Sequence, residues 1–147
     1  MENFNKKEYR EYAERKIPKP TYIKNIIFAF IIGGIICTIG EFIGNYLARL
    51  GYNQESVAAG TSIILVFLGS LLTGLGIYDK IGKVGGAGAA VPITGFANSI
   101  VAPAMEYKRE GFIFGVAAKM FTIAGPVLVY GVGSSIIVGL LSILFKK

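Results

Sequence analysis

The chain has no histidine, and only one of its 147 residues is a cysteine, Cys37. Histidine is the commonest general base and the commonest metal ligand, so too few ligands remain for a zinc site. One cysteine cannot form a disulfide within the chain. Paired carboxylates at a usable spacing are also missing from the sequence. We therefore predict that the protein is not an enzyme and that it uses no cofactor and no metal.

Charge is scarce as well. Only 16% of the residues are charged, against about a quarter in a soluble domain, whereas 53% are hydrophobic and the mean hydropathy is +0.59. This balance favours a membrane protein. The net charge of +6 is compatible with nucleic acid or with anionic lipid as a partner. Because the apolar runs described next are long, we expect membrane lipid as the partner and no nucleic acid.

Two apolar runs are long enough to cross a bilayer. Residues 26–47 carry one charge, Glu41, and residues 57–77 carry none. At a rise of about 1.5 Å per residue, each run can span a hydrocarbon core roughly 30 Å thick as a helix. The link between them, ARLGYNQES, is short and polar. The two helices are therefore predicted to form an antiparallel hairpin.

A third long apolar run, residues 111–145, carries only Lys119. As one helix it is too long for a bilayer unless it is strongly tilted. The pair Gly125-Pro126 lies inside it, and proline removes a hydrogen bond and disfavours helix in the residue before it. We therefore predict a kinked segment over residues 112–145, made of a shorter helical piece (112–124) and a membrane helix (126–145).

Basic residues predict the orientation. The first 24 residues hold seven lysines and arginines, whereas the link after the first run holds only Arg49. By the positive-inside rule, residues 1–24 form a basic cytoplasmic tail and residues 25–147 form the membrane domain. The link at residues 79–83 and the pair Lys146-Lys147 are also basic. All three are therefore expected on one side, which implies an even number of crossings, most simply four.

The tail has mixed charges at helical spacing, which predicts a short surface helix that ends before IPKP, residues 17–20. The predicted fold class is an all-α, multi-pass integral protein of the cell membrane. It has about four membrane-embedded helical segments: residues 26–47, 57–77, 84–105 and 112–145. The third of them is discontinuous and rich in glycine and proline.

The glycine-rich stretch GKVGGAGAAVPITGFANSIVAPAM, residues 82–105, raises three possibilities. A phosphate loop is disfavoured, because GAGAAV lacks the third glycine of the dinucleotide fingerprint and no G-K-[ST] follows. A free linker is disfavoured by the apolar content. Membrane-embedded backbone explains more: Pro92 and Gly95 disfavour a continuous helix, and non-helical backbone at depth must be buried in protein or line water. We predict two half-helices with an irregular middle at residues 91–95.

Two interpretations of this stretch stay open: a solute pathway, and a tight packing interface of small residues without a pathway. Counting residues also does not decide whether residues 84–105 cross the membrane or re-enter from one side. The candidate pathway residues are small or polar. They are Gly85, Gly86, Gly88, Pro92, Thr94, Gly95, Asn98 and Ser99. The polar ones have a plain alternative role, which is hydrogen bonding between helices.

Four charges lie in or beside the apolar segments: Glu41, Asp79, Glu106 and Lys119. A charge exposed to acyl chains at the membrane centre costs about 2.5–3.5 kcal/mol on insertion scales. Glu41 and Lys119 are therefore expected to face the bundle interior or water, where their opposite signs permit pairing. The alternative for both is snorkelling to the membrane surface.

Three stretches in order, GIYDKIG, GAGAAVPITGFANS and EYKREG, resemble the SpoVA family of membrane proteins of spore-forming Firmicutes. The resemblance covers nearly the whole chain. Its most specific part, GAGAAVPITGFANS, is also similar to the smaller member AEb, but that protein begins near the first span. The long tail and YDKIGK favour a longer member of the family.

The resemblance implies a channel subunit that moves dipicolinic acid, with or without its calcium, across the spore inner membrane during sporulation and germination. It also implies an oligomer with the family members AD and AEb. The matching motif, residues 85–99, would be the pathway, with Glu106 and Gly111 as a charged hinge. Two other classes stay open: a secondary transporter component, and a non-conducting membrane scaffold for a peripheral partner.

Overall fold

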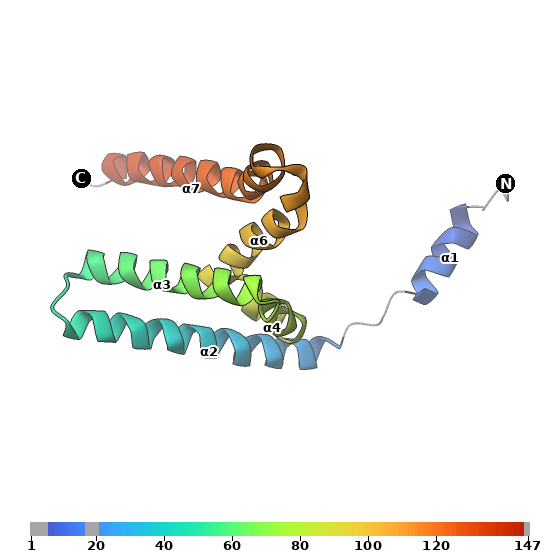
Figure 1. Cartoon of the computed structure of the whole chain (residues 1–147), viewed down its shortest axis with the longest axis horizontal. Helices are drawn as coiled ribbons and strands as arrows, with labels where there is room; N and C mark the ends of the chain where they lie inside the picture. Colours follow the sequence, from blue (N-terminus) through green and yellow to red (C-terminus); the bar gives the residue numbers. More distant parts are fainter. Residues whose placement is uncertain (1–5, 17–20, 146–147) are drawn as a thin grey trace.

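The computed structural model describes residues 6–16 and 21–145, and helices make up almost all of these ranges (Figure 1). Helix α1 (Lys6–Lys16) confirms the predicted tail helix, while the predicted stop at residues 17–20 lies outside the described residues. Helix α2 (Tyr22–Arg49) contains the first predicted membrane run, and α3 (Gln54–Gly74) contains the second as far as residue 74, three residues short of its predicted end. The all-α fold class is confirmed.

Helices α2 and α3 form the predicted antiparallel hairpin (Figure 1). The turn between them contains Gly51, whose φ of 88° is a left-handed conformation that suits glycine. Asn53 then begins α3, because its side chain accepts a hydrogen bond of 2.8 Å from the backbone N–H of Ser56. Local turn chemistry therefore places the two apolar helices side by side.

The glycine-rich stretch is discontinuous, as predicted, but it has two breaks. Helix α4 (Tyr78–Gly85) ends at Gly86, a short turn α5 (Ala87–Ala90) follows, and α6 (Ile93–Glu106) begins after Pro92. The prediction of an irregular middle reaching residue 95 is wrong. Pro92 takes an extended conformation (ψ 166°) as the residue that caps α6, and the helix resumes directly after it.

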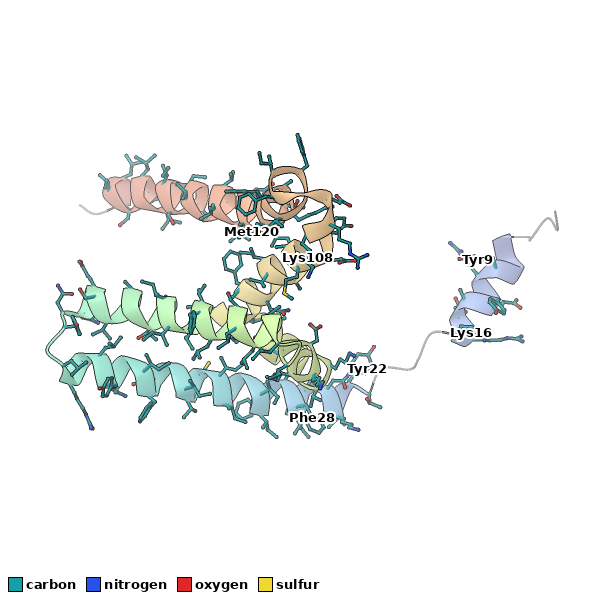
Figure 2. All side chains as sticks on the ribbon, viewed as in Figure 1. Tyr9, Lys16, Tyr22, Phe28, Lys108 and Met120 are labelled. Carbon is teal, nitrogen blue, oxygen red and sulfur yellow. The ribbon has the colours of Figure 1, made fainter. Side chains whose placement is uncertain are left out.

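The segment from α4 to α6 leaves the bundle at the end where it entered. Helix α6 runs back to the end of the structure where α2 begins (Figure 1). Lys108, on the link that follows α6, lies at the same end as Tyr22 (Figure 2). On the way, α5 packs against α2 and α6 packs against α3. The geometry is that of a re-entrant segment, which answers the question that the sequence left open.

The last part of the chain differs from the prediction. A 3₁₀ turn (Tyr107–Glu110) and a π-helical turn η2 (Phe112–Ala117) lead into α7 (Ala118–Phe145), which continues through Pro126. The predicted division at Gly125-Pro126 is therefore wrong. Gly125 has no Cβ for the proline ring to meet, and membrane helices tolerate proline where local adjustments satisfy the freed carbonyl. The helix type changes at residue 117 instead.

Among the described residues, three helical stretches are long and apolar enough to cross a membrane: Tyr22–Arg49, Gln54–Gly74 and Phe112–Phe145. Helix α7 ends at the end of the structure opposite to the start of α2 (Figure 1). Three candidate spans differ from the prediction of four crossings, and the side on which each chain end lies stays a prediction. The prediction of four crossings counted the re-entrant segment as a crossing and gave weight to two C-terminal lysines, which lie outside the described residues.

Candidate functional site

The re-entrant segment contacts the hairpin through glycines. A Cβ placed on Gly88 would lie 2.6 Å from the carbonyl carbon of Ala29 in α2, and its closest contact would be the oxygen of that carbonyl. A Cβ on Gly33 would lie 3.3 Å from the carbonyl oxygen of Gly88. Two backbones are therefore in direct contact, which only residues without a side chain permit. This arrangement matches the packing interpretation of these glycines.

The second half of the segment packs on α3 in the same way. A Cβ on Gly69 would lie 2.8 Å from the carbonyl oxygen of Thr94. A Cβ on Gly95 would overlap the carbonyl oxygens of Ala89 and Ala90, so Gly95 lets α6 fold back on α5. Gly85 contacts α2, because its Cβ would lie 2.7 Å from a methyl group of Ile32. Of the predicted small residues, Gly85 and Gly95 are thus buried between helices and Gly88 is half-buried there.

Gly86 has another role. Its φ of 50° and ψ of −124° turn the chain between α4 and α5, and a Cβ there would meet nothing within 4 Å. A hollow of about 380 Å³ reaches this turn from the start of α2, and Asn25 and Lys83 are among the residues that line it. The turn therefore faces an open, partly polar region that carries a basic side chain.

A tyrosine that the sequence analysis missed holds the segment together. Tyr78, which is 3% exposed, donates a hydrogen bond of 2.7 Å to the carbonyl oxygen of Ala89, and its hydroxyl lies 2.7 Å from the hydroxyl of Thr94. These contacts join α4, α5 and α6. Thr94 can donate to the tyrosine oxygen while the tyrosine donates to Ala89, so both buried hydroxyls are satisfied.

Asn98 joins α6 to α3 through Thr73, which was also missed. The hydroxyl of Thr73 lies 2.7 Å from the carbonyl oxygen of Gly69 and 2.9 Å from the side-chain amide of Asn98. The contact on Asn98 is its Oδ1, and a hydroxyl has one proton to donate, so Thr73 donates to this oxygen or to the Gly69 carbonyl oxygen. Asn98 is half-buried and keeps further hydrogen-bonding capacity.

An apolar cavity of about 210 Å³ lies beside this network, between α2, α3 and α4. Eight of the ten residues that line it are isoleucine or leucine, and the other two are Tyr78 and Thr94. Both hydroxyls already bond to protein atoms. The cavity therefore offers contacts to an apolar group and is poorly suited to a dianion.

The predicted charges do not come together. Glu41 is exposed on α2 and accepts a hydrogen bond of 3.0 Å from the side chain of Asn45. The amino group of Lys119 lies 3.8 Å from the centre of the Tyr107 ring, a cation–π contact. The two charges therefore do not pair, although their opposite signs permit it: Glu41 bonds to Asn45, one turn further along α2, and Lys119 contacts Tyr107, twelve residues earlier in the chain.

Two of the remaining predicted residues lie at the edges of the segment, and Ser99 lies within α6. Asp79 in the first turn of α4 and Glu106 at the end of α6 are both exposed. The hydroxyl of Ser99 donates to the carbonyl oxygen of Phe96, 2.8 Å away, which is a contact within its own helix. Among residues 6–16 and 21–145, three or more potential metal ligands do not gather at any one place.

Comparison with known proteins places this arrangement in a family. Residues 25–141 match the family described as SpoVAC/SpoVAEB sporulation membrane protein, which is not a known enzyme family. Stage V sporulation protein AC of Bacillus subtilis (strain 168) is 45% identical over 143 residues, which cover 97% of this chain and 95% of that protein. No solved structure matches the chain. The chain belongs to the SpoVAC/SpoVAEB family of sporulation membrane proteins.

Proposed function

We propose that this protein is a subunit of a membrane channel for dipicolinic acid, with or without its calcium, in the spore inner membrane, and that it acts in an oligomer with the SpoVA proteins AD and AEb. The observation that supports this best is the re-entrant segment, with its two breaks at Gly86 and at residues 91–92. Broken helices at membrane depth are a common way to present backbone groups to a solute.

The chemistry of the segment suits a dianion. Helix α6 begins inside the bundle after Pro92, which supplies no side-chain cap, so the positive end of its dipole is available. Asn98 lies less than two turns further along the same helix. The hollow that contains Lys83 leads to Gly86 from the α2 end. These groups attract a carboxylate without enclosing it, which a channel needs in order to release its solute.

The glycine contacts limit where a solute could pass. Backbone atoms of the neighbouring helices occupy the space where a side chain at Gly88 or Gly69 would lie. The opposite side of the α5–α6 junction is open, and Val91 there is 83% exposed. We therefore place the proposed path past the open start of α6 at Val91, with the half-buried Asn98 at its inner border, and a neighbouring subunit would complete its outer wall. An assembly of several subunits is part of the proposal for this reason.

Release of dipicolinate from loaded liposomes tests the proposal. Terbium outside the liposomes reports release by its luminescence, first with the purified chain alone and then with AD and AEb added. We expect Asn98→Ala to lower the rate several-fold while assembly is kept. Ser99→Ala is the matched control, because that hydroxyl bonds only within its own helix turn. No release with all partners present, or equal rates for both variants, would contradict the proposal.

A non-conducting scaffold is the second candidate, and the backbone contacts at Gly88 and Gly69 favour it, since they fit a purely structural role. A scaffold gives no release above that of protein-free liposomes. The broken helices also suit a secondary transporter component. Saturation of the rate with dipicolinate and counterflow would identify a transporter, because a channel shows neither.

A further inference from the structure

The outer face of α2 carries polar side chains where a lipid-facing helix should be apolar. Gly34, Thr38, Glu41 and Asn45 are all exposed and follow one another at spacings of four, three and four residues. Thr38 donates to the carbonyl oxygen of Gly34 at 2.8 Å, and Asn45 donates to Glu41 at 3.0 Å. We call these four residues the α2 stripe.

The α2 stripe does not face its own chain. At 100° per residue it lies on the side of α2 opposite to Ala29, Gly33 and Gly40, which contact α5 and α3. Glu41 is eight residues, or about 12 Å along the axis, from the end of the helix at Arg49. A carboxylate in this position requires a polar neighbour.

Helix α7 carries the complementary face. Gly131, Ser135, Val138 and Ser142 follow one another at the same spacings of four, three and four residues, and we call them the α7 stripe. Within residues 118–145, none of the side chains of α7 is buried. The side chains of this stripe border a hollow that Ser134 and Gly139 also line. Small residues with hydroxyl groups are those that let membrane helices approach closely and form hydrogen bonds.

The two stripes run in the same direction and lie at the same depth along the bundle. Helices α2 and α7 run the same way, and both end at the same end of the structure (Figure 1). The α2 stripe faces away from α3, while the α7 ribbon lies on the other side of α3 (Figure 2). The two stripes of one chain therefore point to different neighbours. Aligned in parallel, the residues pair in order as Gly34 with Gly131, Thr38 with Ser135, Glu41 with Val138, and Asn45 with Ser142.

We propose that the α7 stripe of one copy packs in parallel on the α2 stripe of a second copy of this chain. The spacing of four and three residues suits packing at a small crossing angle. The Glu41 side chain points back toward the N-terminus of its helix, to the turn before Val138, where the hydroxyls of Ser134 and Ser135 exchange their bonds to the Gly131 carbonyl oxygen for bonds to the carboxylate. The Ser142 hydroxyl meets the Asn45 amide. The contact joins different surfaces of the two copies, so repetition gives a ring or a chain of subunits. This inference stands whether or not the assembly conducts.

Disulfide trapping between two differently tagged copies tests the inference. Both copies carry Cys37→Ser; one adds Asn45→Cys and the other adds Ser142→Cys. We expect a mixed dimer after mild oxidation of membranes that contain both, because paired Cβ atoms on packed helices can meet the 3.5–4.5 Å that a disulfide needs. Leu144→Cys is the matched control, since it lies at the same level on the opposite side of α7 and is 77% exposed. Equal trapping by Leu144→Cys overturns the proposal, as does trapping only between two Asn45→Cys copies.

Energy transfer between fluorescently labelled copies in lipid vesicles gives a second measurement without cysteine pairs. Glu41→Gln keeps an acceptor for the serine hydroxyls, so its association should stay near that of the unchanged chain. Glu41→Leu removes the acceptor and should weaken association roughly three- to tenfold, which is the range for one hydrogen bond between membrane helices. Because leucine inserts into lipid more readily than glutamate, weaker insertion cannot explain that loss. Association of the leucine variant equal to or tighter than that of the glutamine variant overturns the proposal.

Discussion

Alanine at position 88 should loosen the attachment of the re-entrant segment to α2. The new Cβ would lie 2.6 Å from the carbonyl carbon and 2.8 Å from the Cα of Ala29. Real Cβ atoms do not approach that closely, and backbone atoms of a long helix cannot rotate away as a side chain can. The α2 and α5 backbones must therefore separate, which also disturbs the neighbouring contact between Gly33 and Gly88.

The size of the effect follows from two opposing changes. Inserting a methyl group into a filled space costs about 1–3 kcal/mol. Replacing glycine by alanine in a helical conformation gains about 0.4–1 kcal/mol through the unfolded chain. Gly82→Ala in α4 is the matched control, because its Cβ would meet nothing within 4 Å and only the gain applies. Relative to the control, Gly88→Ala should therefore lose about 1–3 kcal/mol of stability.

Thermal stability in detergent measures this difference. The fraction of each variant that stays monodisperse after heating is followed by size-exclusion chromatography. A dye that reacts with cysteine is unsuitable, since Cys37 is already exposed in the folded protein. For a chain of this size, a loss of about 1 kcal/mol lowers the midpoint by roughly 2–4 °C. A midpoint for Gly88→Ala equal to that of Gly82→Ala would refute the argument that backbone contact holds the segment.

Three further predictions follow from the same geometry. Tyr78→Phe removes a buried hydroxyl and leaves the Ala89 carbonyl without its partner, so it should destabilise the protein by about 1–3 kcal/mol, measured by the same heating assay; an unchanged midpoint would contradict this. Gly86→Ala should cost about 1–3 kcal/mol because of the φ of 50° and ψ of −124° rather than any clash, and the Gly86→Asn variant should cost as much, since asparagine is favoured in the left-handed helical region and this ψ lies outside it. Single cysteines at Asp79 and Phe145, in a chain with Cys37→Ser, should react with an impermeant maleimide from opposite sides of the membrane; labelling from one side would restore an even number of crossings.

Much of the fold could be predicted from the sequence, because long uncharged runs have few alternatives to a membrane helix. The hairpin of α2 and α3 is of this kind, since both runs and the polar link between them are visible in the composition. The discontinuity of residues 84–105 could also be predicted, because Pro92 is incompatible with a continuous hydrogen-bonded helix. In each case a local property of the chain decides the structure.

The errors came from properties that are not local. Whether residues 84–105 cross or re-enter depends on where α6 packs. The contact of Gly69 with Thr94 decides this, and these two residues lie far apart in the sequence. Pro126 looked like a break, but its effect depends on the glycine before it and on the surroundings. Pairing of Glu41 with Lys119 requires a closed bundle, whereas α7 stands apart from the hairpin (Figure 1).

The candidate site also contains residues that could be predicted from local sequence and residues that could not. Asn98 and Thr94 could be singled out, because polar side chains in an apolar stretch are conspicuous. Their partners, Thr73 and Tyr78, could not, since a threonine or tyrosine near the end of a span is ordinary and only the fold brings it into contact. One signal was available, which is the position of Tyr78 in the first turn after an apolar run. A tyrosine there is usually expected at the membrane surface, so this signal indicates an exposed residue and not a buried one.

The shortness of the helices in the re-entrant segment has a consequence for how the protein is made. Helix α4 has eight residues and α5 has four, so neither can insert into lipid by itself. Their burial requires the backbone of Ala29 on one side and, for α6, that of Gly69 on the other. Helices α2 and α3 must therefore leave the translocation machinery and pair before the segment that follows can settle between them. We therefore expect an order in biogenesis, in which the hairpin is the template and the re-entrant segment is laid onto it afterwards.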